Sequence, residues 1–403
     1  MKKFIKVFLM ALVAALLISC GTKPSPETKT ETPVETPVET PEEPKVPETP
    51  QETPGAETET EPTGKVADTD LWLITDVGTI DDKSFNQGSY EGLKMYADEV
   101  DSKANYIQPG EESDAAYLTA IDQAVEGGAK VVVTPGFLFA NVILQAQDKY
   151  PEVKFILIDA VPNNGAQDPA KYVEKVADNT LSILYKESQA GFLAGYAIVK
   201  EGYTKLGYMG GYAVPAVVGF GYGWAAGADY AAKELGVDVT IKYTYLNSFK
   251  PDPQFVTMAG SWYNEGIEVI HAAAGGAGNS VMAAAEAANK LMVGVDVDQK
   301  DESTSVVTSA MKNLRLSVYE ATKSIYEGGF KGGQILNLGV ESQGVQISDD
   351  FSRFNNFTKA DYDAIYAKLL ADEGGMTTNI PDLSTTDDVT KLQFEKVKIE
   401  LVD

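Results

Sequence analysis

Polar residues and glycines follow directly after several short apolar runs of this sequence, and these positions hold the side chains best suited to chemistry. Three aspartates, a glycine of a glycine-rich stretch and one lysine occupy them, namely Asp76, Asp159, Asp296, Gly276 and Lys312. Carboxylates accept hydrogen bonds in pairs, which suits vicinal hydroxyls or ring N–H groups, and they repel phosphate. This chemistry favours an uncharged polyol or a nucleoside over a nucleotide as the ligand.

Cysteine and histidine are too scarce for most metal and redox chemistry. Cys20 is the only cysteine of the 403-residue chain, and His271 is the only histidine. These counts exclude internal disulfides, cysteine-rich zinc sites and multi-histidine metal centres. The glycine-rich stretch 274–278 also lacks the Gly-Lys-Ser/Thr ending of a phosphate-binding P-loop. We therefore expect no cofactor, no bound metal and no catalytic residues.

The net charge of −26 limits the partners. Nucleic-acid binding requires stripes of lysine and arginine that release counterions from the phosphate backbone, so nucleic acid is not an expected partner. An acidic surface also repels anionic lipid. Any attachment to a membrane must therefore come from something other than a basic patch.

The first 19 residues have the pattern of an export signal. A short basic region precedes the apolar run 7–18, which is too short to span a bilayer that needs about 20 residues. The run ends in Leu17-Ile18-Ser19-Cys20, which resembles a bacterial lipobox, so we expect Cys20 to be lipidated. Residues 20–68 are rich in threonine, proline and glutamate, and we interpret them as a disordered linker behind this anchor.

From Leu71 onward, short apolar runs alternate with helical patterns. Several runs are nearly continuous in valine, isoleucine and leucine, as in parallel strands covered on both faces; strands are predicted at 71–75, 130–134, 154–158, 205–208, 267–271, 291–295 and 305–308. Helices are predicted at 113–127, 186–200 and 312–327. This alternation predicts an α/β fold with two doubly wound parallel sheets, in which ligands bind beyond the carboxyl ends of the strands.

Each predicted sheet forms the centre of one lobe. We expect lobe 1 to comprise residues 70–181 with 300–332, and lobe 2 to comprise 182–299 with 333–403, so that the chain crosses between them three times. Phe220 and Trp224 lie four residues apart on a predicted helix and are expected in the core. A ligand between the lobes would close them, because only the closed state contacts it from both sides.

An ordered series of motifs resembles the basic membrane protein (BMP) family, the purine-nucleoside-binding lipoproteins of ABC transporters. The series covers nearly everything from about Leu71 to Val340. It consists of TDVG at 75–78 followed by DDKSFNQ at 81–87, QAGFLAG at 189–195, GYMGG at 207–211, the run AAAGGAG at 272–278, GVDVDQ at 294–299 and TSAMK at 308–312. The fold that this resemblance implies is that of the type I periplasmic binding proteins.

The resemblance also implies roles for individual residues, with the purine held between two aromatic rings. Phe85 would supply one ring, and Asn86 and Asp159 would hydrogen-bond the base. The ribose hydroxyls would contact Asp76, Asp296, Lys312 and the backbone N–H groups of the Gly276 loop. His271 stands where the family usually carries phenylalanine or tyrosine for the second ring. If it stacks on the base, affinity should fall between pH 7 and 5; otherwise His271 is a core residue.

The expected function is that of an extracytoplasmic substrate-binding lipoprotein of an ABC importer. Its partners would be a purine nucleoside (adenosine, guanosine or inosine), the permease and ATPase subunits, and the cell membrane through the lipid anchor, and we expect a monomer. Two alternatives remain on the same fold. One is a nucleoside-cleaving hydrolase, which would use an aspartate cluster with Ca²⁺, and the other is a receptor for a sugar or a signal molecule.

Overall fold

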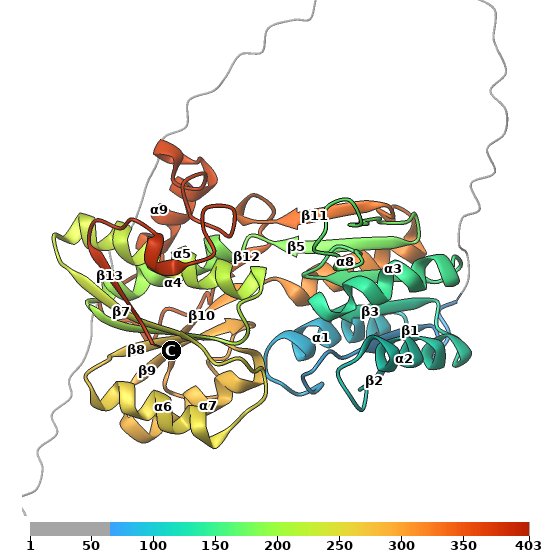
Figure 1. Cartoon of the computed structure of the whole chain (residues 1–403), viewed down its shortest axis with the longest axis horizontal. Coiled ribbons are helices and arrows are strands. Elements are labelled where there is room, and N and C mark those ends of the chain that lie inside the picture. Colours follow the sequence, from blue (N-terminus) through green and yellow to red (C-terminus); the bar gives the residue numbers. More distant parts are fainter. Residues whose placement is uncertain (1–64, 403) are drawn as a thin grey trace, which may run out of the picture. The chain divides into compact units, whose positions relative to one another are not determined.

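A computed structural model describes residues 65–402. The predicted signal peptide, Cys20 and all but the last residues of the predicted linker lie outside this range. None of the helices within 65–402 has the length and apolar character that a membrane crossing requires. The described residues contain two mainly parallel sheets with helices on their faces (Figure 1), which confirms the predicted fold class.

The first sheet has six parallel strands in the order β11-β5-β4-β3-β1-β2. Their bounds are β1 Leu71–Ile74, β2 Ala104–Ile107, β3 Val131–Pro135, β4 Lys154–Ile158, β5 Thr180–Tyr185 and β11 Gln334–Leu338. With the helices α1 (Phe85–Glu99), α2 (Asp114–Glu126), α3 (Ala140–Lys149) and α8 (Leu314–Glu327) these strands form lobe 1.

Successive residues of the first sheet point to opposite faces, as the pleat requires. Val131 and Val133 join the core beneath α1 and α8, whereas Val132 joins a second core with Ile121 of α2 and Val142 of α3. Burial on both faces explains why the central strands are almost continuously apolar.

The second sheet has seven strands in the order β12-β10-β9-β8-β6-β7-β13. Their bounds are β6 Lys205–Gly210, β7 Val239–Tyr245, β8 Val269–Ala273, β9 Leu291–Asp296, β10 Val306–Lys312, β12 Val345–Ile347 and β13 Val397–Leu401. Only β12 pairs in the antiparallel sense among them, with β10. With α4 (Glu187–Glu201), α5 (Pro215–Leu235), α6 (Pro253–Asn264), α7 (Gly278–Ala288) and α9 (Lys359–Leu370) these strands form lobe 2.

Helices α4 and α5 pack against each other through glycines spaced four residues apart. A Cβ atom on Gly195 of α4 would lie 2.1 Å from the carbonyl oxygen of Trp224, and one on Gly227 of α5 would lie 1.9 Å from that of Phe192. Neither position can carry a side chain while the backbones approach this closely. The same packing continues at Gly191, where a Cβ would lie 2.2 Å from the carbonyl oxygen of Phe220, and so it also positions the first turns of α5, which line the ligand pocket described below.

Two strands belong to the other lobe than the one predicted from the sequence, so the points where the chain passes between the lobes also differ. Strand β5 continues in the first sheet to Tyr185. Strand β10, predicted in lobe 1, pairs with β9 in the second sheet, and β11, predicted in lobe 2, pairs with β5 in the first. The chain therefore passes between the sheets after Tyr185, Lys312 and Leu338. Local hydrophobic patterns cannot assign a strand to one of two sheets, because that choice depends on pairing between residues far apart in sequence.

Candidate ligand-binding site

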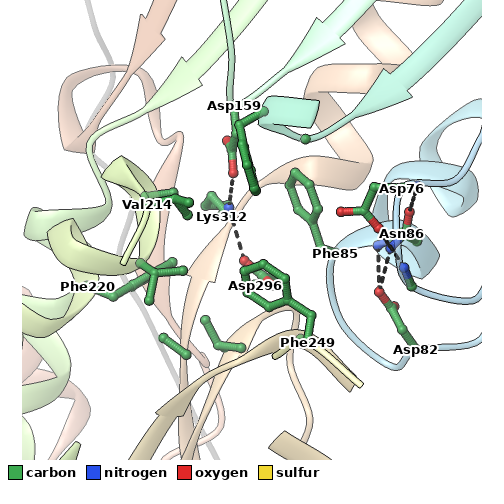
Figure 2. Close-up of a pocket in the computed structure, with 18 of the residues that line it drawn as sticks. Asp76, Asp82, Phe85, Asn86, Asp159, Val214, Phe220, Phe249, Asp296 and Lys312 are labelled. Carbon is green, nitrogen blue, oxygen red and sulfur yellow. Dashed lines mark hydrogen bonds and ion pairs between the residues drawn. The ribbon is translucent and has the colours of Figure 1, made fainter. Parts of the chain in front are cut away.

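A pocket lies at the carboxyl ends of strands from both sheets. Its walls surround about 680 Å³ of space, a value that includes the open mouth. Its lining comes from both lobes and consists of Asp76, Gly78, Asp82, Phe85, Asn86, Gly136, Phe137, Asp159, Val214, Pro215, Ala216, Val217, Phe220, Phe249, Ala273, Gly275, Gly276, Val295, Asp296 and Lys312 (Figure 2). Seven of the eight ligand-binding residues predicted from the sequence are among them.

Lys312 is the charged centre of the pocket. Its ammonium donates to Asp159 Oδ2 at 2.5 Å and lies 3.1 Å from Asp296 Oδ1, with all three side chains at most 9% exposed. Burial lowers the pKa of Lys312, but the charges of Asp159, Asp296 and Glu187 outweigh this effect and raise the pKa above its ordinary value. The lysine is therefore charged at neutral pH and is neutralised by carboxylates from both lobes.

Both aspartates occupy strained backbone positions at strand ends. Asp159 follows β4 with φ 58°, and Asp296 ends β9 with φ 67°. Left-handed backbone is uncommon for residues other than glycine, although aspartate tolerates it better than most, and such positions cluster at functional sites. In this protein the strained turns hold two carboxylates against the same ammonium. Lys312 itself ends β10, whereas the sequence predicted that it opens a helix; α8 begins only at Leu314.

The loop between β1 and α1 holds a second group of carboxylates. Asn86 donates both amide hydrogens, to Asp76 Oδ1 at 2.8 Å and to Asp82 Oδ2 at 2.9 Å, and its oxygen accepts from the backbone N–H of Asp76. Asp82 also accepts from the backbone N–H groups at the start of α1. Asn86 thus holds the loop together through its donors, and only its oxygen retains capacity for a ligand.

Asp76 keeps one oxygen available to the pocket. Its Oδ1 accepts from Gly78 N–H at 2.8 Å and from Asn86, and no hydrogen bond to Oδ2 is recorded among the described residues. Burial raises the pKa of Asp76 to about 6, although the hydrogen bonds from Gly78 and Asn86 lower it. The carboxyl is therefore mostly ionised at pH 7.5 and becomes protonated under mildly acidic conditions.

Aromatic rings line the pocket from both lobes. The ring of Phe85, from lobe 1, has the Lys312 ammonium 4.4 Å from its centroid. Phe249, in the loop after β7, packs edge to face on Tyr212. A Cβ on Gly211 would lie 2.2 Å from the Phe249 ring, so glycine is required there for this ring to approach. The sequence analysis did not predict Phe249 as a site residue. It lies four residues after the end of β7, whose sequence alternates regularly between apolar and polar residues.

His271 lies in the core and does not line the pocket, which corrects its predicted place on the ligand. It is the central residue of β8 and is fully buried. Its Nδ1 lies 3.2 Å from the carbonyl oxygen of Val293, and its ring packs on Phe220 and Trp224. The predicted core position is confirmed for Trp224, whereas Phe220, equally buried, also reaches the pocket wall. Residues in the middle of a strand point into the cores between sheet and helices, so the site takes its residues from strand ends.

Residues 65–402 contain no group of three or more histidine, cysteine, aspartate or glutamate side chains placed to hold an ion. Each carboxylate of the pocket bonds through at least one oxygen to Lys312, Ser84, Asn86 or backbone N–H groups.

The family follows from comparison with known proteins. A sequence model of the Bmp family, described as "ABC transporter substrate-binding protein PnrA-like", matches residues 71–376. The chain belongs to the Bmp family. It is therefore a substrate-binding protein of an ABC transporter, and the resemblance seen in its motifs is confirmed.

Relatives of this Bmp-family protein include basic membrane protein A1 of Borrelia garinii, which is 31% identical over 67% of this chain and 76% of its own. The ABC transporter nucleoside-binding protein BmpA of Lactococcus lactis is 28% identical over 72% of this chain and 84% of its own. Among solved structures, an ABC transporter solute-binding protein from Aeropyrum pernix covers 79% of this chain and 84% of its own, with 24% identity and a TM-score of 0.61. This structural likeness supports the fold.

Proposed function

We propose that this protein is an extracytoplasmic, lipid-anchored receptor that binds purine nucleosides between its lobes. It would deliver them, as a monomer, to the permease and ATPase subunits of an ABC importer. The proposal goes beyond family membership in naming the ligand, the anchor and the partners.

One observation carries the ligand proposal. Asp159 lines the pocket, and its Oδ1 atom is buried and has no hydrogen-bond partner among the described residues. A buried carboxylate oxygen without a donor costs free energy, on the order of 1–3 kcal/mol or more. A ligand that brings an N–H or O–H group to this atom recovers that cost. The ring N–H of a purine such as inosine or guanosine is a donor of the required kind.

The charge of the pocket favours nucleosides over nucleotides. Four carboxylates and one ammonium line it, and the ammonium of Lys312 already lies between Asp159 and Asp296. A phosphate in the pocket would be repelled by these carboxylates, and the described lining has no further cation to offset the repulsion. Neutral hydroxyls, by contrast, can donate to Asp76 Oδ2 and to Asp296. The Lactococcus lactis relative is named as a nucleoside-binding protein, which supports the same ligand class.

The apolar lining favours a flat base. Base stacking on an aromatic side chain contributes about 1–3 kcal/mol, and Phe85 and Phe249 offer rings from opposite lobes. Phe249 replaces His271 as our candidate for the second ring. A free sugar would gain much less from these rings than a nucleoside does.

The test is calorimetry of the purified chain against inosine, guanosine and adenosine, with ribose and AMP as controls. We expect the nucleosides to bind at least a hundredfold more tightly than either control. Tighter binding of ribose would favour the sugar receptor, and tighter binding of AMP would overturn the argument from charge. Chromatography of the same mixtures tests the hydrolase alternative, because free base appearing with time would mark an enzyme.

The anchor is tested separately. We expect cells that express the wild-type chain to incorporate labelled palmitate into the protein, and cells that express Cys20→Ser to release an unlabelled protein. Equal labelling of both chains would contradict lipidation at Cys20.

A further inference from the structure

A short loop of lobe 1 is bonded to lobe 2 at several points beside the pocket. Residues 82–84, between β1 and α1, form what we call the clasp. Ser84 Oγ donates to Asp296 Oδ2 at 2.6 Å, and the Lys83 carbonyl accepts from Gln299 Nε2 at 2.8 Å. Asn279 donates to the Asp82 carbonyl at 3.4 Å. Each bond joins protein atoms only, so it can form before a ligand enters.

The central members of these contacts are buried. Ser84 is fully buried, Asp296 is 5% exposed and Gln299 is 2% exposed. Buried hydrogen bonds to charged groups are stronger than exposed ones. Two ion pairs also join the lobes near the mouth, Lys250 with Glu112 and Lys83 with Glu302. Their side chains are 30–63% exposed, so both pairs are expected to contribute little.

The backbone around Gln299 is adapted to this contact. Gln299 Oε1 accepts from Val295 N–H at 3.1 Å, which leaves its Nε2 directed at lobe 1. A Cβ on Gly294 would lie 2.5 Å from Gln299 Oε1, so only glycine leaves room there. On the opposite side, Lys83 presents its carbonyl from a left-handed conformation, φ 61°, which is unusual for lysine.

The clasp connects directly to predicted ligand-binding residues in both lobes. On lobe 1 it leads directly into Phe85 and Asn86, and Asp82 fixes it to the start of α1. On lobe 2 it ends at Asp296. A polar chain therefore crosses the cleft twice, from Ser84 to Asp296, from Asp296 to Lys312 and from Lys312 back to Asp159 in lobe 1.

We propose that Ser84 and Gln299 are positioning residues that hold the lobes together and thereby set the ligand affinity. Gln299 does not line the pocket, so its effect acts through the position of the clasp. Loss of the clasp reduces the fraction of molecules in the binding-competent arrangement, and apparent affinity falls by the same factor. The part of this inference that concerns affinity rests on the proposed nucleoside ligand.

The test compares two buried glutamines with matched hydrogen bonds. Gln299→Leu removes bonds to Lys83 and Val295. The control Gln147→Leu removes bonds of the same kind, from Nε2 to the Lys175 carbonyl at 2.8 Å and from Ala177 N–H to Oε1 at 3.0 Å, all within lobe 1. Gln299→Glu keeps an acceptor for Val295 but has no N–H for Lys83, and Ser84→Ala removes the bond to Asp296.

Two measurements on the full chain separate the outcomes. The first is the distance distribution between spin labels on cysteines introduced at Lys130 in lobe 1 and Glu286 in lobe 2, in a Cys20→Ser background. The second is inosine affinity by calorimetry, with folding of each variant checked by circular dichroism. We expect all three clasp variants to broaden the distances. Ser84→Ala, which loses a hydrogen bond to a charged group, should weaken binding about tenfold, and Gln299→Leu and Gln299→Glu, which lose a neutral one, about fivefold.

Gln147→Leu should lower the melting temperature, but its distance distribution and its inosine affinity should equal those of the wild type. Identical behaviour of Gln147→Leu and Gln299→Leu in both measurements, or wild-type distances in the three clasp variants, would overturn the proposal. If the wild type binds no nucleoside, the ligand proposal fails. The distance distributions then still decide whether the clasp holds the lobes.

Discussion

The single histidine allows a sharp prediction about stability and pH. His271 is enclosed by β6, β9 and α5, and its Nδ1–H can donate to the Val293 carbonyl. Its Nε2 is buried and has no partner among the described residues. Protonation would place a charge and a second N–H group in an apolar core. Burial accordingly lowers the pKa of His271 from 6.5 to about 4, against the smaller raising effects of Val293 and Asp296.

The loss of stability on acidification follows from the difference between the pKa values of His271 in the unfolded and folded chains. The unfolded chain binds a proton at this histidine below about pH 6.5, but the folded chain does so only below about pH 4. The stability contributed by the neutral histidine is thus present above pH 6.5 and is lost as the pH falls towards 4. A shift of this size corresponds to about 3 kcal/mol in total, of which about 2 kcal/mol is lost by pH 5.

The assay is urea unfolding of the wild type and His271→Phe at several pH values between 7.5 and 5. Other titrating groups are common to both proteins, so the difference between their unfolding free energies isolates the histidine. We expect the wild type to lose about 2 kcal/mol more than His271→Phe over this range. Parallel profiles would refute the neutral buried histidine. The pH dependence of ligand affinity should be the same in both proteins, contrary to the expectation from sequence.

Other predictions concern the pocket. Phe85→Ala should weaken nucleoside binding at least tenfold because a stacking contact of about 1–3 kcal/mol is lost; wild-type affinity by calorimetry would remove Phe85 from the site. Asp296→Asn should also cost at least tenfold, since a charged acceptor contributes roughly 1.5–3 kcal/mol, and an unchanged dissociation constant would show that the ligand does not contact it. Because the pKa of Asp76 is raised to about 6, affinity should fall about fourfold between pH 7.5 and 5.5 as the acceptor is protonated. Asp76→Asn should bind more weakly with a flat pH profile, and a retained pH dependence would assign it to another group.

Residues at strand ends were the predictable part of the site. Asp76, Asp159 and Gly276 were expected at the ligand because open parallel sheets bind ligands beyond the carboxyl ends of their strands. The structure brings these residues to one pocket with Phe85 and Asp296. This result needs only the order of strands and helices, which strong apolar runs reveal.

The parts that could not be predicted depend on distant pairing. Strand β7 has the alternating sequence VTIKYTY and forms no continuous apolar run, so the sequence predicted neither this strand nor Phe249 in the loop that follows it. His271 was placed on the ligand by analogy of position, but the side-chain alternation of β8 directs it into the core. Asn86 was predicted to hydrogen-bond the base; its two donors are instead bonded to Asp76 and Asp82, and a contact of its oxygen with the base stays a prediction. These three residues lie in one short segment, but the hydrogen bonds among them depend on how that segment folds and produce no periodic pattern in the sequence.

The most direct test of the central claim is the identity of the ligand that the protein itself retains. The chain, purified without denaturation from the cells that express it, is examined by native mass spectrometry and then heated to release bound molecules for identification. We predict one purine nucleoside per chain in the wild type, and none in the double variant Phe85→Ala with Asp296→Asn. A sugar, a nucleotide or a free base in the wild type would contradict the account.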